Sequence, residues 1–255
     1  ADYGLIEIIS VMAESPAEQA GLQPGDLIYM VDEKSAAELG YYGTVAAVRG
    51  EEGSEVELTV LRGENYESSE TYTVKRAQIT EITVTSQMAA DSNIGIVRIS
   101  EFNTATVEQF DEAIDTLLTQ GAEKLLFDLR YNPGGELNSI TQILDKLLPE
   151  GDIIIVTDKD GKQSTLATSD AEALDMPMAV LINGSSASAA ELFAASIRDY
   201  EKGALIGETT YGKGTMQTLV PLPDGSCVSI SYRMFTSAGG VNYEGVGIAP
   251  DIEVP

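Results

Sequence analysis

The feature that most limits the fold of this 255-residue chain is a change in the pattern of apolar residues near residue 78. Before that point, short strand-like segments such as Leu27 to Val31 and Val56 to Arg62 are separated by turns. After it, short apolar runs alternate with segments of helical spacing, for example Thr106 to Gln120. Such alternation predicts an α/β core. We therefore expect a small β-rich domain with short helices over residues 1–77 and a larger α/β domain over residues 78–255.

The small domain contains one clearly marked helix start. Ser15 is a candidate N-cap, Pro16 stands at the first helical position and Gly21 is typical of a helix end. A second short helix is expected over residues 44–48. The polar, β-leaning stretch 75–91 is expected to connect the two domains.

Two residue types that usually support catalysis or metal binding are missing or scarce. The chain has no histidine and a single cysteine, Cys227. A Ser-His-Asp triad, a Cys-His dyad and a histidine-ligated metal site are therefore excluded within this chain. One cysteine also excludes an intrachain disulfide and a cysteine-based zinc site.

The charge balance argues against nucleic acid as a partner. The chain has 15 basic and 41 acidic residues, which gives a formal net charge of −26. A chain of this charge repels phosphate backbones. The acidic residues are spread along the chain, which favours a solubility role. No apolar run approaches the roughly 20 residues that a membrane-spanning helix needs.

The first candidate functional segment contains Gly134 and Gly135, between an apolar strand and a helix. Two consecutive glycines allow the backbone to approach a ligand closely, with N–H groups free to donate. Taken alone, the segment is more typical of a plain strand-to-helix turn.

The second segment, residues 183–191, carries Ser185, Ser186 and Ser188 before another helix. A serine in the first turn of a helix lies beside free backbone N–H groups and the positive end of the helix dipole, which favour a developing oxyanion. Ordinary N-capping is the plainer interpretation of serines at this position.

The third segment places Lys213 between two glycines. Without histidine, a serine nucleophile needs another base, and a lysine that loses its water shell can serve. A surface hairpin turn is the alternative. A phosphate-binding loop is rejected because Gly214 follows Lys213 and Glu208 occupies the position of the first glycine.

Taken together, these segments resemble the C-terminal processing peptidases (tail-specific proteases), which are Ser–Lys serine proteases with a PDZ domain. The order and joint presence of the motifs carry the resemblance, which covers nearly the whole chain. In chain order the motifs are Ser15-Pro16-Ala17, Ala20-Gly21-Leu22, Pro24-Gly25-Asp26, Asp128-Leu129-Arg130, Asn132-Pro133-Gly134-Gly135, Ser186-Ala187-Ser188-Ala189-Ala190-Glu191, Gly207-Glu208, Gly212-Lys213-Gly214-Thr215, Gln217 and Gly245-Val246-Gly247-Ile248-Ala249-Pro250-Asp251.

The resemblance implies a role for each of three side chains. Ser188 aligns with the family's nucleophile, Lys213 with the general base and Gln217 with the residue that orients the lysine. An exposed strand glutamine is the plainer interpretation of Gln217. Ser185 and Ser186 are then loop residues.

The family's oxyanion hole consists of backbone N–H groups. Here the resemblance implies those of Ala189 and of Gly134 or Gly135. The resemblance also implies that the α/β core is related to the crotonase and Clp-protease folds, with the PDZ domain hinged over the site. It implies no metal and no cofactor.

The PDZ resemblance is incomplete at its N-terminal side. The family's carboxylate-binding loop precedes the strand matched by residues 5–11, so we expect an N-terminally incomplete PDZ domain. Ile6, Ile8 and Val45 are candidates for an apolar peptide groove, although simple packing in the PDZ core is the plainer interpretation of each of them.

The implied activity is endoproteolysis near protein C-termini, with protein or peptide substrates and an extracytoplasmic setting; a homo-oligomer is compatible with it. One rival is a catalytically inactive peptide-binding module of the same fold. Another is a crotonase-type acyl-thioester enzyme, which lacks an obvious carboxylate pair near Gly134 apart from Glu136.

Overall fold

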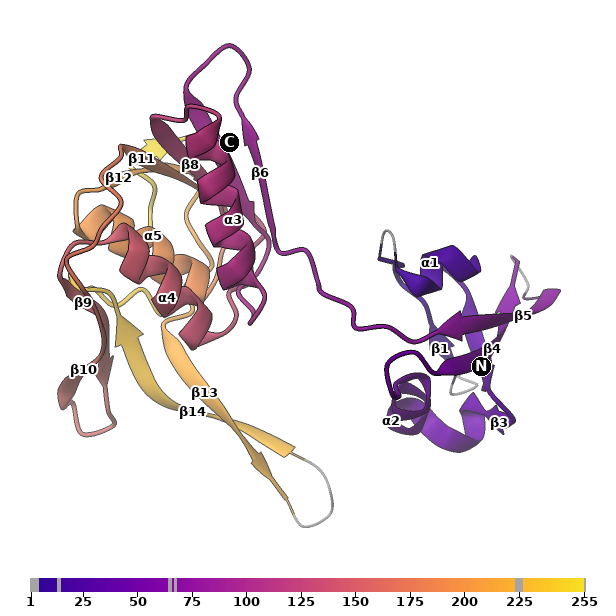
Figure 1. Cartoon of the computed structure of the whole chain (residues 1–255). Coiled ribbons are helices and arrows are strands. Elements are labelled where there is room, and N and C mark those ends of the chain that lie inside the picture. The colour runs from indigo at the N-terminus through magenta and orange to yellow at the C-terminus, as the bar shows by residue number, and fades with distance from the viewer. Residues whose placement is uncertain (1–4, 13–14, 64–65, 67, 223–226, 255) are drawn as a thin grey trace. The chain divides into compact units, whose positions relative to one another are not determined.

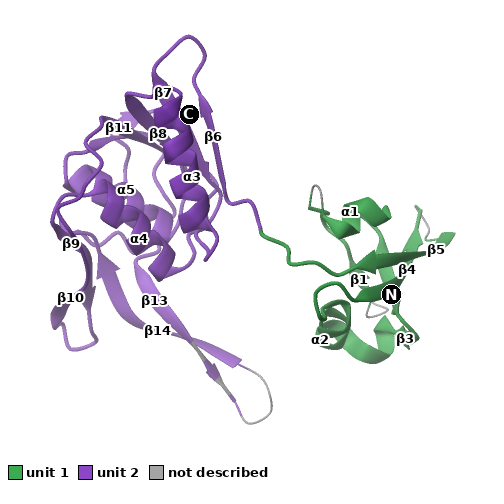
Figure 2. Ribbon diagram, viewed as in Figure 1, with its two compact units in different colours: residues 1–80 green, residues 81–255 purple. Residues whose placement is uncertain are grey.

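The computed structural model describes residues 5–12, 15–63, 66, 68–222 and 227–254. The chain divides into two compact units, Ala1–Thr80 and Glu81–Pro255 (Figures 1 and 2). Each unit has its own hydrophobic core. Within the described part of the chain, no helix combines the length and apolar character needed to cross a bilayer.

The smaller unit is built on an antiparallel sheet with strand order β1-β2-β4-β5, and β3 pairs with β2. Its core residues include Val31, Val56 and Val60. Its elements are β1 (Ile6–Glu7), α1 (Pro16–Ala20), β2 (Leu27–Val31), β3 (Lys34–Ser35), α2 (Ala36–Val48), β4 (Glu55–Arg62) and β5 (Ser68–Lys75).

The helix expected after Ser15 is confirmed, whereas the second helix is longer than expected. The Ser15 hydroxyl accepts a hydrogen bond from the Glu18 amide at 3.2 Å, and Gly21 ends α1 at φ 97°. Helix α2 covers Ala36–Val48 rather than 44–48. It bends at Gly40, whose φ of 65° is non-helical, and this break divides the helical pattern.

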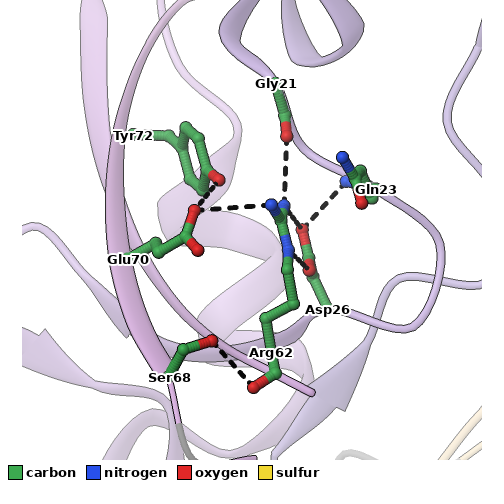
Figure 3. A network of polar contacts seen from close by, with 7 residues as sticks. All are labelled: Gly21, Gln23, Asp26, Arg62, Ser68, Glu70 and Tyr72. Carbon is green, nitrogen blue, oxygen red and sulfur yellow. Dashed lines mark hydrogen bonds and ion pairs between the residues drawn. The ribbon is translucent and has the colours of Figure 1, made fainter.

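An ion pair between the half-buried Arg62 and the buried Asp26 joins the end of β4 to the turn before β2 (Figure 3). The Arg62 guanidinium donates to both carboxylate oxygens of Asp26 at 2.6 and 2.7 Å and to the Gly21 carbonyl at 3.0 Å. It also lies over the Tyr72 ring, 5.4 Å from the centroid. Asp26 is only 1% exposed. The hydrogen bonds from Arg62, assisted by one from the Gln23 amide, lower the pKa of Asp26 against the opposing effect of burial.

We expect Arg62→Ala to destabilise the smaller unit by about 3 kcal/mol, because it leaves a buried carboxylate without its cation. Since the folded-state pKa of Asp26 is lowered, the pair stabilises the fold above about pH 3.9 and loses this effect as the pH falls through the folded-state pKa. Hydrogen exchange of β4 and β5 amides in the whole chain, at neutral and acidic pH, measures the loss. The exposed Arg49→Ala is the control, and equal losses in both variants would contradict the prediction.

The larger unit contains two sheets and three helices within its described residues (Figure 1). A six-stranded sheet has the order β15-β12-β11-β8-β7-β6, and a four-stranded antiparallel sheet has the order β10-β9-β14-β13. The elements are β6 (Val84–Met88), β7 (Ile94–Ile99), α3 (Thr106–Thr119), β8 (Lys124–Asp128), α4 (Leu137–Leu147), β9 (Gly151–Thr157), β10 (Gln163–Ser169), β11 (Met178–Ile182), α5 (Ala189–Asp199), β12 (Gly203–Gly207), β13 (Thr215–Pro221), β14 (Cys227–Thr236) and β15 (Ile252–Glu253).

The alternation predicted for the larger unit is confirmed, with one correction at its beginning. The stretch 75–91 is not wholly a connector, because β6 pairs antiparallel with β7 at the edge of the six-stranded sheet. Gln109 of α3 supports this edge: its side-chain oxygen accepts hydrogen bonds from the amides of Thr83 and Val84 at 2.8 and 3.0 Å. These long-range contacts override the polar composition of the segment.

The topology brings two of the candidate segments together. Strands β8 and β11 are parallel neighbours, so their carboxyl ends lie at the same edge of the sheet. The glycine turn follows β8, and the serine segment follows β11 and leads into α5. Residues Ala189 to Ile197 of that helix are all buried, which anchors it in the core.

Candidate active site

Ser188 is the N-cap of the 11-residue helix α5 and has a strained backbone. Its φ is 55° and its ψ is −114°, a conformation that costs a residue with a side chain about 1–3 kcal/mol. The side chain is half-buried. Its amide donates to the Glu191 carboxylate at 2.8 Å, which helps to hold the conformation. Strain of this kind is concentrated at functional positions.

The three serines of the segment have different surroundings. Ser186 is fully buried; its hydroxyl donates to the Leu129 carbonyl at 2.8 Å and accepts from the Asn183 amide at 3.0 Å. Ser185 is exposed. Ser186 therefore ties the serine segment to the end of β8, and Ser188 alone is presented at the helix tip.

Gly134 lies against Ser188 so closely that a side chain cannot fit between them. A Cβ atom on Gly134 would lie 2.8 Å from the Cβ of Ser188 and 2.9 Å from the Ala189 nitrogen, and φ is +103°. Asn132 links the two turns, because its side chain accepts from the Gly134 amide at 2.8 Å and its carbonyl accepts from the Ala187 amide at 2.9 Å.

The candidate oxyanion donors are not equivalent. The Gly134 N–H donates to Asn132 and is therefore engaged. The N–H groups of Ala189 and Gly135 have no hydrogen-bond acceptor among the residues that the structure describes. This geometry favours Ala189 and Gly135 as the donors available to a ligand.

A buried carboxylate joins the serine segment to the lysine segment. Glu191 is 0% exposed, and its Oε2 accepts from the amides of Ser188 at 2.8 Å and Lys213 at 2.7 Å. Its Oε1 accepts from the Gly212 amide at 2.6 Å and from the Thr210 hydroxyl. Because both amides donate to the same oxygen atom, the backbones of Ser188 and Lys213 lie close together.

The structure brings the backbones of Ser188 and Lys213 together without a direct bond between their side chains. Lys213 is half-buried, and within the described residues its amine makes no ion pair and no hydrogen bond, including with the Ser188 hydroxyl. Catalytic hydrogen bonds are often long before substrate binds. Gln217 is exposed on β13 and donates across the ribbon to Ser231 at 3.4 Å, so it is not joined to Lys213 here.

An ion pair fixes the strand end that precedes the glycine turn. Arg130 donates to both carboxylate oxygens of Asp128 at 2.9 and 2.7 Å. Burial would raise the pKa of Asp128, but the hydrogen bonds from Arg130 outweigh this effect and lower it. The next residue, Tyr131, donates its amide to the side chain of Asn183 at 3.0 Å and so connects the two turns again.

The three residues proposed for a peptide groove do not share one cavity. Ile8 lines a largely apolar cavity of about 600 Å³ in the smaller unit, with Arg49 and Lys75 also in its wall. Ile6 and Val45 are half-buried and lie outside that lining.

Sequence reasoning used Glu191 only as a motif marker and missed its contacts. A signal was present, because a glutamate three residues after a serine at a helix start has the spacing of a capping box. The spacing indicates that the carboxylate turns back toward the Ser188 amide. The bonds to residues 210–213 come from a segment about 20 residues away and have no local signature.

We expect Gly134→Ala to lower any activity of Ser188 by about 10²-fold, because the added methyl group must displace Ser188 or the glycine turn. Peptide hydrolysis measured beside thermal unfolding checks this. Gly161→Ala is the matched control: Gly161 also has positive φ, at +80°, but a Cβ there would meet no heavy atom within 4 Å. If both variants behave alike, the close approach to Ser188 is not the cause.

Fold and site together define a two-unit protein in which a PDZ-type domain precedes an α/β peptidase core. The family model for "Peptidase family S41" matches residues 93–254, and a PDZ domain model matches residues 7–62. The chain belongs to peptidase family S41. The expected fold class and family resemblance are thereby confirmed.

Several named proteins are similar over nearly the whole chain. The carboxy-terminal processing protease CtpA of Bacillus subtilis is 36% identical over 253 residues, covering 98% of this chain and 53% of that protein. The carboxyl-terminal-processing protease of Synechocystis is 32% identical over 249 residues, which cover 96% of this chain and 58% of that protein. This chain therefore spans little more than half the length of these relatives.

Solved structures support the same fold. The photosystem II D1 C-terminal processing protease superposes with a TM-score of 0.62 at 28% identity, covering 98% of this chain and 68% of that one. An S41 protease from Bacteroides fragilis gives a TM-score of 0.59 at 19% identity, and the match covers 98% of this chain and 74% of that one.

Proposed function

We propose that this chain is a serine endopeptidase that uses a Ser188–Lys213 dyad. The observation that carries the proposal is the Glu191 carboxylate, one oxygen of which holds the amides of both residues. A buried group with these contacts holds the backbones of a candidate nucleophile and a candidate base close to each other. Family membership supplies the reaction class.

In the proposed reaction, Ser188 is the nucleophile and Lys213 is the base. The Ser188 hydroxyl oxygen bonds to a peptide carbonyl carbon while Lys213, in its neutral form, takes the hydroxyl proton. The amides of Ala189 and Gly135 donate to the oxygen that becomes negative. The C–N bond then breaks as Lys213 returns the proton to the leaving amine, and water hydrolyses the ester with Lys213 again acting as base. For Gln217 to orient the lysine, its side chain would have to leave Ser231 and bond to the Lys213 amine.

We infer that the substrates are proteins cleaved near their C-termini. The Bacillus subtilis relative is named a carboxy-terminal processing protease, and its similarity extends over 98% of this chain. The PDZ-type unit would dock or regulate these substrates, and its largely apolar cavity beside Ile8 offers room for an apolar side chain. An extracytoplasmic setting and a homo-oligomer belong to the same proposal.

A catalytically inactive peptide-binding module is the second candidate. One observation favours it: within the described residues no hydrogen bond joins the Ser188 hydroxyl to the Lys213 amine. Under this alternative the chain would bind peptides through the same units and leave them intact.

Three parallel assays on the whole chain distinguish the candidates. We expect cleavage of denatured casein, no hydrolysis of an acyl-CoA, and a mass increase on Ser188 after treatment with a fluorophosphonate. Binding of casein without cleavage and without labelling would support the inactive module. Acyl-CoA hydrolysis without peptide cleavage would support a thioester enzyme of the crotonase type.

A further inference from the structure

The direction of the Lys213 side chain depends on the two peptide planes that flank its Cα atom. Glycines on both sides leave the chain there with unusual freedom, so these planes must be held by other groups. The plane before Lys213 is held on both edges. The Lys213 N–H donates to Glu191, and the Gly212 carbonyl accepts from the Gly245 amide at 2.8 Å.

The plane after Lys213 is held by a different carboxylate. The Gly214 N–H donates to Oε2 of Glu244, which lies 30 residues further along the chain. The amide of Glu244 in turn donates to the side chain of Asn242 at 2.8 Å, which fixes the loop that carries it. Three consecutive amides, from Gly212 to Gly214, therefore all donate to carboxylates.

The loop that carries Glu244 packs tightly on the lysine segment. A Cβ atom on Gly212 would lie 2.8 Å from the Gly247 nitrogen and 3.1 Å from the Tyr243 carbonyl oxygen. The loop from Asn242 to Gly247 therefore cannot shift without moving the backbone beside Lys213.

We propose that Glu244 is a positioning residue for Lys213. Its carboxylate sets the plane that follows the lysine, as Glu191 sets the plane that precedes it, and together they fix the direction in which the side chain leaves the backbone. Glu244 is exposed, so, unlike the buried Glu191, it does not also support the core. The inference rests on the proposed function, because the position of Lys213 matters for hydrolysis only if Lys213 is the base.

The test compares three variants of the whole chain in peptide hydrolysis. Without its carboxylate, the Gly214 plane can rotate and Lys213 loses its direction. We therefore expect Glu244→Ala to lower kcat about tenfold with little change in KM. Glu244→Gln keeps an oxygen that accepts from the Gly214 amide and should recover most of the rate. Glu150→Ala, an exposed glutamate with no hydrogen bond among the described residues, removes the same charge and should match the unmodified chain.

Amide hydrogen exchange of Gly214 gives a second readout that does not depend on activity. We expect faster exchange at Gly214 in Glu244→Ala and protection in Glu244→Gln, with unchanged melting temperatures. An unmodified rate in Glu244→Ala, or equal losses in the alanine and glutamine variants, would overturn the proposal. If the unmodified chain shows no hydrolysis that depends on Ser188, the proposed function fails, and Gly214 exchange still decides whether Glu244 holds the lysine segment.

Discussion

Replacing Ser188 with alanine is expected to reduce peptide hydrolysis by at least about 10⁴-fold. The substitution removes the atom that bonds to the carbonyl carbon, while the backbone donors of Ala189 and Gly135 remain. Those donors and substrate binding leave only a small residual rate. The loss is expected in kcat, with KM little changed, and the rate of cleavage of a denatured protein substrate measures it.

Two kinds of variant make this prediction specific. Lys213→Ala should cause a loss of similar size, and the double variant should be no worse, because residues that act as a unit do not contribute additively. Ser185→Ala, an exposed serine three positions before Ser188, should keep full activity. Ser186→Ala should lower stability, because its buried hydroxyl bonds to the Leu129 carbonyl.

An unchanged rate of hydrolysis in Ser188→Ala would show that the activity comes from a contaminating protease. Additive losses in the Ser188 and Lys213 variants would show that the two residues act independently. Either result would remove the dyad from the proposed function.

Glu191→Gln is expected to cause the second large loss, about 10³-fold in kcat/KM, even in folded protein. The glutamine side chain keeps one oxygen acceptor and presents an NH₂ group to the remaining donors. Whichever way it is oriented, this group faces two of four donors: either the amides of Ser188 and Lys213, or the Thr210 hydroxyl and the Gly212 amide. Each buried donor left without an acceptor costs about 1–3 kcal/mol. The serine and lysine segments should therefore separate.

Urea unfolding and steady-state kinetics on the same samples check this prediction. We expect Glu191→Gln to be destabilised by about 3 kcal/mol, from the unsatisfied donors and the loss of a buried charge that accepts four hydrogen bonds. The exposed Glu150→Gln serves as the control. Full activity with reduced stability would show that Glu191 supports the core without setting the position of Lys213.

Much of the fold was predictable because its signals are local. The Ser15 cap and Gly21 end of α1 are set by side chains within a few residues of each other. Strands β8 and β11 and helix α5 also follow from the apolar patterning of short segments. The sequence pattern predicts only the end of helix α2 because Gly40 bends the helix, and the polar composition of β6 predicts a connector because only pairing with β7 makes it part of a sheet.

The candidate site was predictable only as a set of residue types. The absence of histidine, the serine at a helix start and the lysine between glycines are properties of the sequence, and they make a serine with a lysine base a candidate, whereas the roles of Ser188 and Lys213 came from the family resemblance. The choice between Gly134 and Gly135 as oxyanion donor was open at that level. It depends on a hydrogen bond from Gly134 to Asn132, which needs the folded turn.

By itself, the sequence determined which atoms are available for chemistry: a hydroxyl, an amine, two glycine amides and no imidazole. The tertiary structure alone decided which of the segments that carry them lie together. Glu191 and Glu244 reach Lys213 and Gly214 across gaps of 22 and 30 residues. Contacts over such distances are made by packing β strands and helix α5 into one core, and no local pattern encodes them.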